Sequence, residues 1–287
     1  MPSQTTDSPV AETSAEPSPR TIRIHNEPRF IRRRITIAAI ALVAILVPVL
    51  FLTTGAPEPK AAPPVPDAVE TLAASLANDR TTTFAVVGDS TGDNVGEWVY
   101  MIAVWIGTTY DKSVTIQTWD SVAGYYHPAQ SMTEGKSGSV MIFNGSAPGR
   151  DMQYSTEYLA ALLPSSREIG SVFVSHAHNQ APKDIKGPLT VLANAIAELH
   201  PESKLGVVLQ NPDNLPDVLQ RERVESMRAW AERRGIPTID VLDAFLATGD
   251  FSPLLADRLH PNEAGYEVWA SVFEDALVDA APRPADQ

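Results

Sequence analysis

Residues 84–92 read FAVVGDSTG, in which an apolar run ends abruptly at a Gly-Asp-Ser-Thr-Gly sequence. An apolar run of this kind followed by glycine predicts a buried strand that turns sharply at its carboxyl end. Ser90 has Gly88 and Gly92 two positions away on either side, and such small neighbours permit a tight bend. The stretch is therefore either a plain strand-to-helix turn or a bend that presents Ser90 as a nucleophile.

The patterns around this strand predict an α/β domain. Short apolar runs alternate with amphipathic helical patterns, which favours a mainly parallel sheet with helices on both faces, a three-layer α/β/α sandwich. The expected strands are residues 84–87, 114–118, 140–143, 171–175, 205–209 and 238–241. The expected helices are residues 95–108, 152–163, 188–199, 216–234 and 261–278. Residues 119–139 fit no clear element and indicate a loop or hairpin insertion.

The aromatic and aliphatic residues of two helical stretches are expected to pack in the core rather than to line a pocket. In the first helical stretch these residues are Trp98, Tyr100 and Trp105. In the last one they share one face at helical spacing and are Ala264, Val268, Trp269, Val272, Phe273, Ala276 and Leu277.

Three segments of different composition precede the domain. Residues 1–34 begin with a Pro-, Ser-, Thr- and Glu-rich stretch that predicts disorder. Residues 35–54 carry no charge, and this length is sufficient to cross a bilayer as a helix. Residues 55–66 are rich in Pro and Ala and predict a stiff linker, so the domain is expected at residues 67–287.

Residues 35–54 have two interpretations. As an uncleaved single-pass anchor they would leave residues 1–34 in the cytoplasm, because arginines stand just before the span, and the domain outside the cytoplasm. As a signal peptide they would be cleaved and the domain secreted. The long leader and the lack of a clear small-x-small cleavage site favour the anchor.

The composition excludes two classes of function. The chain has no cysteine, so it forms no disulfide and carries out no thiolate chemistry. Its net charge is −13, whereas a nucleic-acid surface needs clustered Lys and Arg to contact phosphates. We therefore expect no nucleic-acid partner.

A nucleophilic serine needs a base, and the sequence contains six histidines. The most informative is His260, in LADRLHPNEAGYEVWA at 255–270, because Asp257 precedes it by three residues. In a single turn this spacing lets the carboxylate accept a hydrogen bond from the imidazole Nδ1–H and orient the ring. The alternative is a capping aspartate beside a solvated histidine at the start of the last helix.

Of the other five histidines, four lie in the expected domain and have less informative surroundings. His176 and His178 follow an expected strand and are interpreted as loop residues near the mouth of a pocket, where one of them could contact substrate. Neither has a nearby carboxylate or thiolate to complete a metal site. His200 stands at the end of an expected helix, as a cap or turn residue, and His127 lies in the irregular insertion.

Two motifs together resemble the SGNH hydrolase family, also called GDSL esterases and lipases. GDS at 88–90 resembles the first motif of that family, and DRLHPNEAGY at 257–266 resembles its last motif. The resemblance implies an α/β/α domain with a shallow site at the carboxyl ends of the strands. It also implies a catalytic triad of Ser90, His260 and Asp257.

The second and third motifs of the family would supply an oxyanion hole. MIFNGSAPGR at 141–150 resembles the second motif through Gly149, with Gly145 as the alternative. VFVSHAHNQ at 172–180 resembles the third through Asn179. The resemblance thus implies three donors, the backbone N–H groups of Ser90 and Gly149 and the Asn179 amide.

The third motif also departs from the family pattern, because Ala177 stands where the family has glycine and Gln180 where it has aspartate. The implied activity is hydrolysis of carboxylic esters without a metal or organic cofactor. The expected substrates are short acyl esters, such as acetyl groups on cell-wall polysaccharide, or lipid esters. Two alternatives stay open, an O-acyltransferase with the same triad and a catalytically silent envelope protein that binds glycan or a partner.

Overall fold

The computed structural model describes residues 66–180, 185–215 and 219–281. The predicted disordered segment and membrane-spanning helix, and all of the predicted linker except residue 66, lie outside these ranges, and these assignments stay predictions. Within the described ranges, no helix is both long enough and apolar enough to cross a bilayer.

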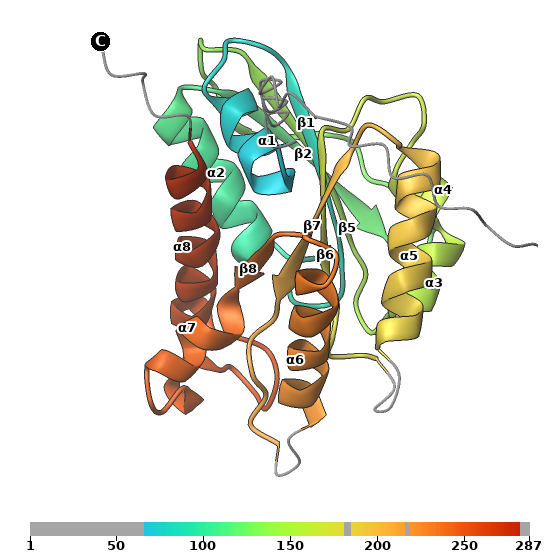
Figure 1. The fold of residues 1–287 in the computed structure, drawn as a ribbon. Coiled ribbons are helices and arrows are strands. Elements are labelled where there is room, and N and C mark those ends of the chain that lie inside the picture. Colours follow the sequence, from blue (N-terminus) through green and yellow to red (C-terminus); the bar gives the residue numbers. More distant parts are fainter. Residues whose placement is uncertain (1–65, 181–184, 216–218, 282–287) are drawn as a thin grey trace, which may run out of the picture. The chain divides into compact units, whose positions relative to one another are not determined.

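A single sheet forms the centre of the domain (Figure 1), with the strand order β3-β2-β5-β1-β6-β7-β8 and β4 beside β2. The strands are β1 (Thr82–Gly88), β2 (Ser113–Asp120), β3 (Tyr125–Tyr126), β4 (Gln130–Thr133), β5 (Ser139–Ser146), β6 (Ser171–Ser175), β7 (Lys204–Leu209) and β8 (Thr238–Asp240). The six strands from β2 to β8 in this order are parallel, while β3 and β4 pair antiparallel with β2. The predicted mainly parallel sheet is confirmed.

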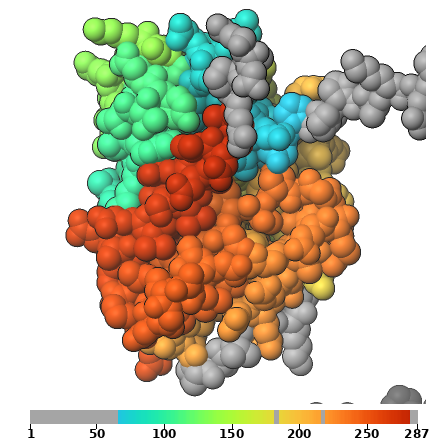
Figure 2. All heavy atoms as spheres, turned by 60° about the vertical axis from the view of Figure 1, so that its left-hand side comes forward, coloured from blue at the N-terminus to red at the C-terminus, as the bar shows by residue number. Residues whose placement is uncertain are grey.

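Helices cover both faces of this sheet (Figure 1), as the α/β/α prediction requires. They are α1 (Ala68–Leu76), α2 (Trp98–Tyr110), α3 (Met152–Glu157), α4 (Leu159–Leu162), α5 (Lys186–Leu199), α6 (Leu219–Glu232), α7 (Val241–Ala247), the 3₁₀ helix η1 (Ser252–Leu254) and α8 (Glu263–Ala280). Helices α1, α2 and α8 share one core with the sheet, and α3 to α6 share the other. Figure 2 shows α8 and α2 lying side by side at the surface.

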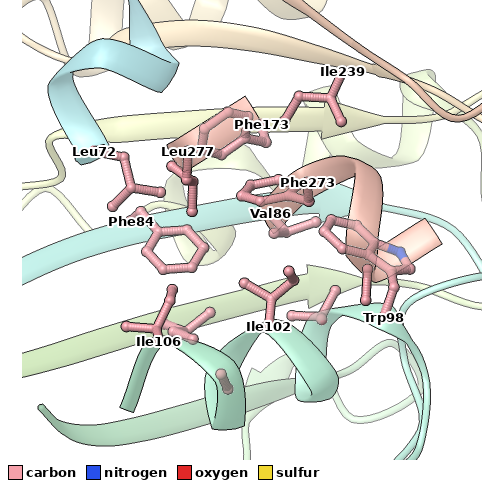
Figure 3. Close-up of a cluster of buried hydrophobic side chains, with 14 of the residues drawn as sticks. Leu72, Phe84, Val86, Trp98, Ile102, Ile106, Phe173, Ile239, Phe273 and Leu277 are labelled. Carbon is pink, nitrogen blue, oxygen red and sulfur yellow. The ribbon is translucent and has the colours of Figure 1, made fainter. Parts of the chain in front are cut away.

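Aromatic rings fill the core between the sheet and helices α1, α2 and α8 (Figure 3). Trp98 of α2 stacks on Trp269 of α8 with ring centroids 5.6 Å apart, and Phe173 of β6 packs on Phe273 at 5.0 Å. Trp98 and Tyr100 are buried, as the sequence predicts, and Trp105 packs against the same core while partly exposed. This packing fixes the position of α8, the helix that begins just after His260.

Several boundaries differ from the sequence-based expectations. Val241, predicted to end a strand, begins α7, because the Asp240 side chain caps this helix by accepting a hydrogen bond from the Asp243 N–H. The expected helix at 152–163 is divided into α3 and α4 around Tyr158. Ala264 is exposed, since the buried face of α8 centres on Trp269, Phe273 and Leu277. The insertion at 119–139 contains the end of β2 and the short strands β3 and β4.

The topology places a crevice at the end of β1. Helix α2 carries the chain from β1 to β2 on one side, and α3 and α4 carry it from β5 to β6 across the other face. Strand β1 lies between β5 and β6, where the direction of winding reverses. In open α/β sheets, ligands bind at such a reversal, outside the carboxyl ends of the strands.

Candidate active site

Ser90 lies just beyond the end of β1, on a bend that its neighbours hold in place. The Asp89 side chain is buried, and its Oδ1 accepts hydrogen bonds from the Thr91 N–H at 3.2 Å and the Thr91 hydroxyl at 2.9 Å. Ser90 itself is partly exposed. The bend therefore turns the serine outward while the aspartate before it points inward.

His260 lies on a short loop between η1 and α8, directly beside Ser90. The Ser90 Oγ is 2.9 Å from the His260 Nε2, and the His260 Nδ1 is 2.8 Å from the Asp257 Oδ2. The other carboxylate oxygen of Asp257 accepts the N–H groups of Leu259 and His260, both at 2.7 Å. A β-bridge between Leu255 and Pro261 closes the loop. The structure thus brings the three predicted triad residues into one hydrogen-bonded chain.

The hydrogen bonds in this loop define which nitrogen of His260 faces the serine. The hydrogen bond from the His260 side chain is the main reason that the pKa of Asp257 is lowered to about 2. An ionised carboxylate accepts hydrogen bonds only, so the His260 Nδ1 carries the proton that it shares with Asp257. In the neutral ring, Nε2 is then free to accept the proton of the Ser90 hydroxyl.

Gly149 and Asn179 follow the two strands that flank β1. Gly88, two residues before Ser90, is in register with Ser146 of β5 and Ser175 of β6. Gly149 comes three residues after Ser146, in an exposed turn with φ +70°, a conformation that favours glycine. The Asn179 Nδ2 donates a hydrogen bond of 3.2 Å to the carbonyl of Arg150, which places this amide against the same turn.

One backbone N–H group on the bend and one in this turn have no hydrogen-bond acceptor among the residues that the structure describes. Neither the Ser90 N–H nor the Gly149 N–H donates a hydrogen bond to another described residue. Gly145, the alternative to Gly149, lies within β5 in register with Val87. Gly149 lies in a turn beyond the end of β5, whereas Gly145 lies within that strand, so position favours Gly149 as the candidate oxyanion donor.

The two departures in the third motif have structural roles. Ala177 is buried among apolar residues under the α3–α6 layer. Gln180 accepts the Met152 N–H through its Oε1 at 3.1 Å and donates from Nε2 to Gln153 at 2.9 Å. Its carboxamide thereby holds the start of α3, and an acceptor oxygen is retained where the family has a carboxylate.

The prediction that His176 and His178 lie near a pocket mouth is wrong, because both imidazoles are buried and have partners inside the domain. His176 Nε2 lies 2.8 Å from the Ser155 Oγ, and His178 Nε2 lies 3.1 Å from the Asn211 carbonyl. Burial lowers the pKa of both histidines. His200 is the C-cap residue of α5 and hydrogen-bonds the Leu163 carbonyl, which agrees with its predicted place at a helix end.

Two amides that sequence reasoning missed connect the motifs. Gln210, just after β7, donates through Nε2 to the Asp89 Oδ1 and to the Ser175 carbonyl, both at 3.0 Å, and accepts the His178 N–H. Asn211 donates through Nδ2 to the Leu259 carbonyl at 2.9 Å. These residues tie the bend at Ser90, the end of β6 and the His260 loop together. Their only sequence signal is two consecutive amides directly after an expected strand.

The buried carboxylate of Glu97 ties the segment after Ser90 to α8. Glu97 accepts the Asn94 N–H at 2.9 Å and the Tyr266 hydroxyl at 3.1 Å. Burial raises the pKa of Glu97 and also that of Asp93, which lies between it and Ser90 in the sequence. The Glu97–Tyr266 hydrogen bond therefore holds the serine segment against the helix that begins just after His260.

Neither a family model nor a curated protein matches this sequence. Solved structures do match. A two-domain esterase active on acetylated mannans has a TM-score of 0.55 at 15% identity, covering 74% of this chain and 52% of its own. A lipase/acylhydrolase from Enterococcus faecalis has a TM-score of 0.50 at 17% identity, covering 71% of this chain and 100% of its own.

A third match is an α/β hydrolase enzyme from the metagenome of Lake Arreo, Spain. It has a TM-score of 0.50 at 16% identity and covers 70% of this chain and 97% of its own. The chain spans about half the length of the two-domain esterase. At these identities the similarity establishes the fold, which this chain shares with an esterase, a lipase/acylhydrolase and an α/β hydrolase enzyme.

Proposed function

We propose that this protein is a serine esterase that hydrolyses carboxylic esters through Ser90, His260 and Asp257. The observation that carries the proposal is the continuous chain from the Ser90 Oγ through His260 to the Asp257 carboxylate, with distances of 2.9 and 2.8 Å. Nucleophile, base and orienting carboxylate within hydrogen-bond reach form the arrangement that activates a serine hydroxyl. The fold shared with solved esterases supports the same activity.

Acylation follows from this geometry. The Ser90 Oγ bonds to the ester carbonyl carbon while its proton moves to the His260 Nε2, and the carbonyl electrons move onto the oxygen. The N–H groups of Ser90 and Gly149 and the Asn179 amide stabilise that negative charge. The tetrahedral species then collapses, the bond to the alcohol oxygen breaks, and His260 returns its proton to the leaving alcohol.

Deacylation repeats these steps with water as the nucleophile, which gives the carboxylic acid and free Ser90. No residue of the site requires a metal or an organic cofactor for these steps. An acceptor alcohol in place of water would give an O-acyltransferase with the same three residues. Product analysis with an added acceptor alcohol distinguishes the two reactions.

The proposed substrates are short acyl esters, in particular acetyl groups on cell-wall polysaccharide. One solved structure with this fold is an esterase active on acetylated mannans, which supports an acylated polysaccharide as substrate. The proposed location is the cell envelope, with residues 35–54 as a single-pass anchor and the domain outside the cytoplasm. The uncharged span and the arginines before it support that location.

The test uses the full-length protein, a fluorophosphonate probe and p-nitrophenyl acetate. We expect the wild-type protein to be labelled and to release p-nitrophenol, and Ser90→Ala to do neither. Ser155→Ala is the matched control, because Ser155 is also hydrogen-bonded to a histidine but is fully buried. A folded wild-type protein that is neither labelled nor active would refute the esterase and favour the catalytically silent binding protein.

A further inference from the structure

A groove with a volume of about 490 Å³ lies next to the segment that follows Ser90 and to the turn at residues 148–149. Asp93 and Asn94, three and four residues after Ser90, line it. Pro148, which directly precedes Gly149, lines it as well. The groove therefore borders both the nucleophile segment and the turn that carries a proposed oxyanion donor, so a group bound in it would be continuous with the reacting ester.

The antiparallel insertion that ends at β4 supplies the other part of the groove, and internal hydrogen bonds hold this insertion in place. Trp119 donates from Nε1 to the Tyr154 hydroxyl at 2.9 Å and packs on the Tyr126 ring at 5.2 Å between centroids. The Asp120 carboxylate accepts two backbone N–H groups of the following turn, at 2.9 and 2.8 Å. These contacts restrict the motion of the wall, which lowers the entropy cost of binding a ligand.

The lining combines hydrogen-bonding groups with exposed apolar side chains. The polar residues carry carboxylates, amides, hydroxyls and an imidazole, and are Asp93, Asp120, Asn94, Gln130, Tyr100, Thr118, Ser121 and His127. Val95 and Val122 also line the groove, although 73% and 94% of their surfaces are exposed. A sugar ring offers hydroxyls at its edge and C–H groups on its faces, which matches both kinds of lining.

Two other classes of ligand match the groove less well. A fatty acyl chain would remove water from these polar groups without replacing their hydrogen bonds, which is unfavourable. A phosphorylated or carboxylated ligand would approach two aspartates and be repelled. A neutral ligand with several hydroxyls avoids both costs, and the groove has the volume of an ordinary small-molecule site.

We propose that this groove binds the alcohol part of the ester substrate, and that this part is a neutral, hydroxyl-rich group such as a sugar ring. The proposal rests on the proposed esterase function, since it assigns the groove to the leaving group of that reaction. To test this proposal, the side chains of His127 and Gln130 are truncated to alanine. The backbone of His127 holds its place through hydrogen bonds with Thr118 and Gln117, which a substitution to alanine leaves intact.

The kinetic test compares three acetyl esters that differ only in the alcohol. The substrates are ethyl acetate and the 6-O-acetyl derivatives of methyl glucoside and N-acetylglucosamine. In the double variant His127→Ala/Gln130→Ala we expect kcat/KM for the acetylated sugars to fall about tenfold or more. For ethyl acetate we expect a change of less than about twofold, since its alcohol does not reach these side chains. Ser131→Ala is the matched control, an exposed residue of β4 next to Gln130 that does not line the groove.

Equal losses on both kinds of ester, no loss on either, or an enzyme active on ethyl acetate alone would overturn the proposal. So would a preference for long acyl chains that the double variant abolishes, since the groove would then hold the acyl group. If the wild-type protein hydrolyses no ester at all, the esterase proposal fails, and saturation-transfer NMR with methyl glucoside and N,N′-diacetylchitobiose tests the groove by itself. Signal transfer that the double variant loses supports sugar binding, and no transfer to either sugar overturns it.

Discussion

The domain contains two serine–histidine pairs with nearly the same distance but different surroundings. Ser90 and His260 are 2.9 Å apart, and Ser155 and His176 are 2.8 Å apart. The first pair lies at the carboxyl ends of the strands and is partly exposed, while the second is fully buried between α3 and the end of β6. A distance alone therefore does not distinguish a nucleophile from a structural hydroxyl.

The partners of the two imidazoles explain the difference. His260 donates to an ionised carboxylate, Asp257, which orients the ring and would stabilise its charged form in the proposed proton transfer. Burial lowers the pKa of His176, so a charged His176 is unfavourable. Only the first pair combines access for a substrate with support for a protonated imidazole, and the following predictions test that contrast.

The largest expected effect comes from the two serines. Ser90→Ala should lower kcat/KM for p-nitrophenyl acetate by about 10⁶, as loss of a catalytic serine does. Ser155→Ala should leave activity within about tenfold of wild type but lower the free energy of unfolding by about 1–3 kcal/mol, because the buried His176 Nε2 loses its partner. Ester hydrolysis and urea unfolding of both variants measure this, and similar losses of activity would show that the contrast between the pairs is wrong.

The second effect concerns the carboxylate. Asp257→Asn should lower kcat by about 10⁴, because a side-chain amide facing Nδ1 favours the ring tautomer with its proton on Nε2. That tautomer cannot accept the Ser90 proton. Asp275→Asn, an exposed aspartate on α8, is the matched control for loss of one negative charge. An Asp257→Asn protein with nearly full activity would remove the orienting carboxylate from the mechanism.

A third effect separates two neighbouring amides in the third motif. Asn179→Ala should lower kcat by about 10² to 10³, the usual cost of losing one oxyanion donor. Gln180→Ala should reduce activity far less and should mainly affect stability, since its carboxamide contacts Met152 and Gln153 at α3. Single-turnover kinetics and thermal unfolding distinguish these outcomes. The reverse order of effects would place the oxyanion donor at residue 180 and not at residue 179.

The parts of the site that local sequence could predict are those held within one segment. Asp257 and His260 share a turn, so their spacing alone places the carboxylate near the ring. Ser90 is likewise placed by the strand before it and the glycines around it. Gln210 and Asn211 lie about 120 residues from the bend at Asp89 and about 50 from the His260 loop, and only the sheet register brings them together.

In the fold, too, contacts between segments that are distant in the sequence could not be predicted. The parallel strands follow from apolar runs, but the pairing of residues 119–139 depends on edge contacts with β2 that have no periodic signal. The burial of His176 and His178 depends on partners from α3 and from the segment after β7, which a local pattern cannot supply. Because histidine is polar and both residues follow a strand, the sequence predicted that His176 and His178 are exposed. Hydrogen bonds to distant segments bury them instead.

A smaller effect is expected on the pH dependence of activity. Protonation of His260 removes the lone pair that accepts the Ser90 proton, so kcat/KM should fall about tenfold per pH unit on the acid side. The pKa of Asp257 is lowered to about 2, so this carboxylate stays ionised and should add no second acid limb above pH 4. Rates from pH 4 to 8 measure the slope, and a slope of two protons would indicate that another group must also be deprotonated.

The smallest effect concerns stability, and it comes from the buried pair. Burial lowers the folded-state pKa of His176 below its ordinary value of 6.5, so the unfolded chain binds more protons below that pH. Stability should therefore be fully present above about pH 6.5 and should decrease as the pH falls, by at most about 1.4 kcal/mol per pH unit for this histidine. His176→Gln, which does not titrate and retains a polar group near Ser155, should reduce that slope in urea unfolding between pH 7 and 5. An unchanged slope would mean that His176 takes up its proton without unfolding and that its burial does not keep it neutral, which would weaken the contrast with His260.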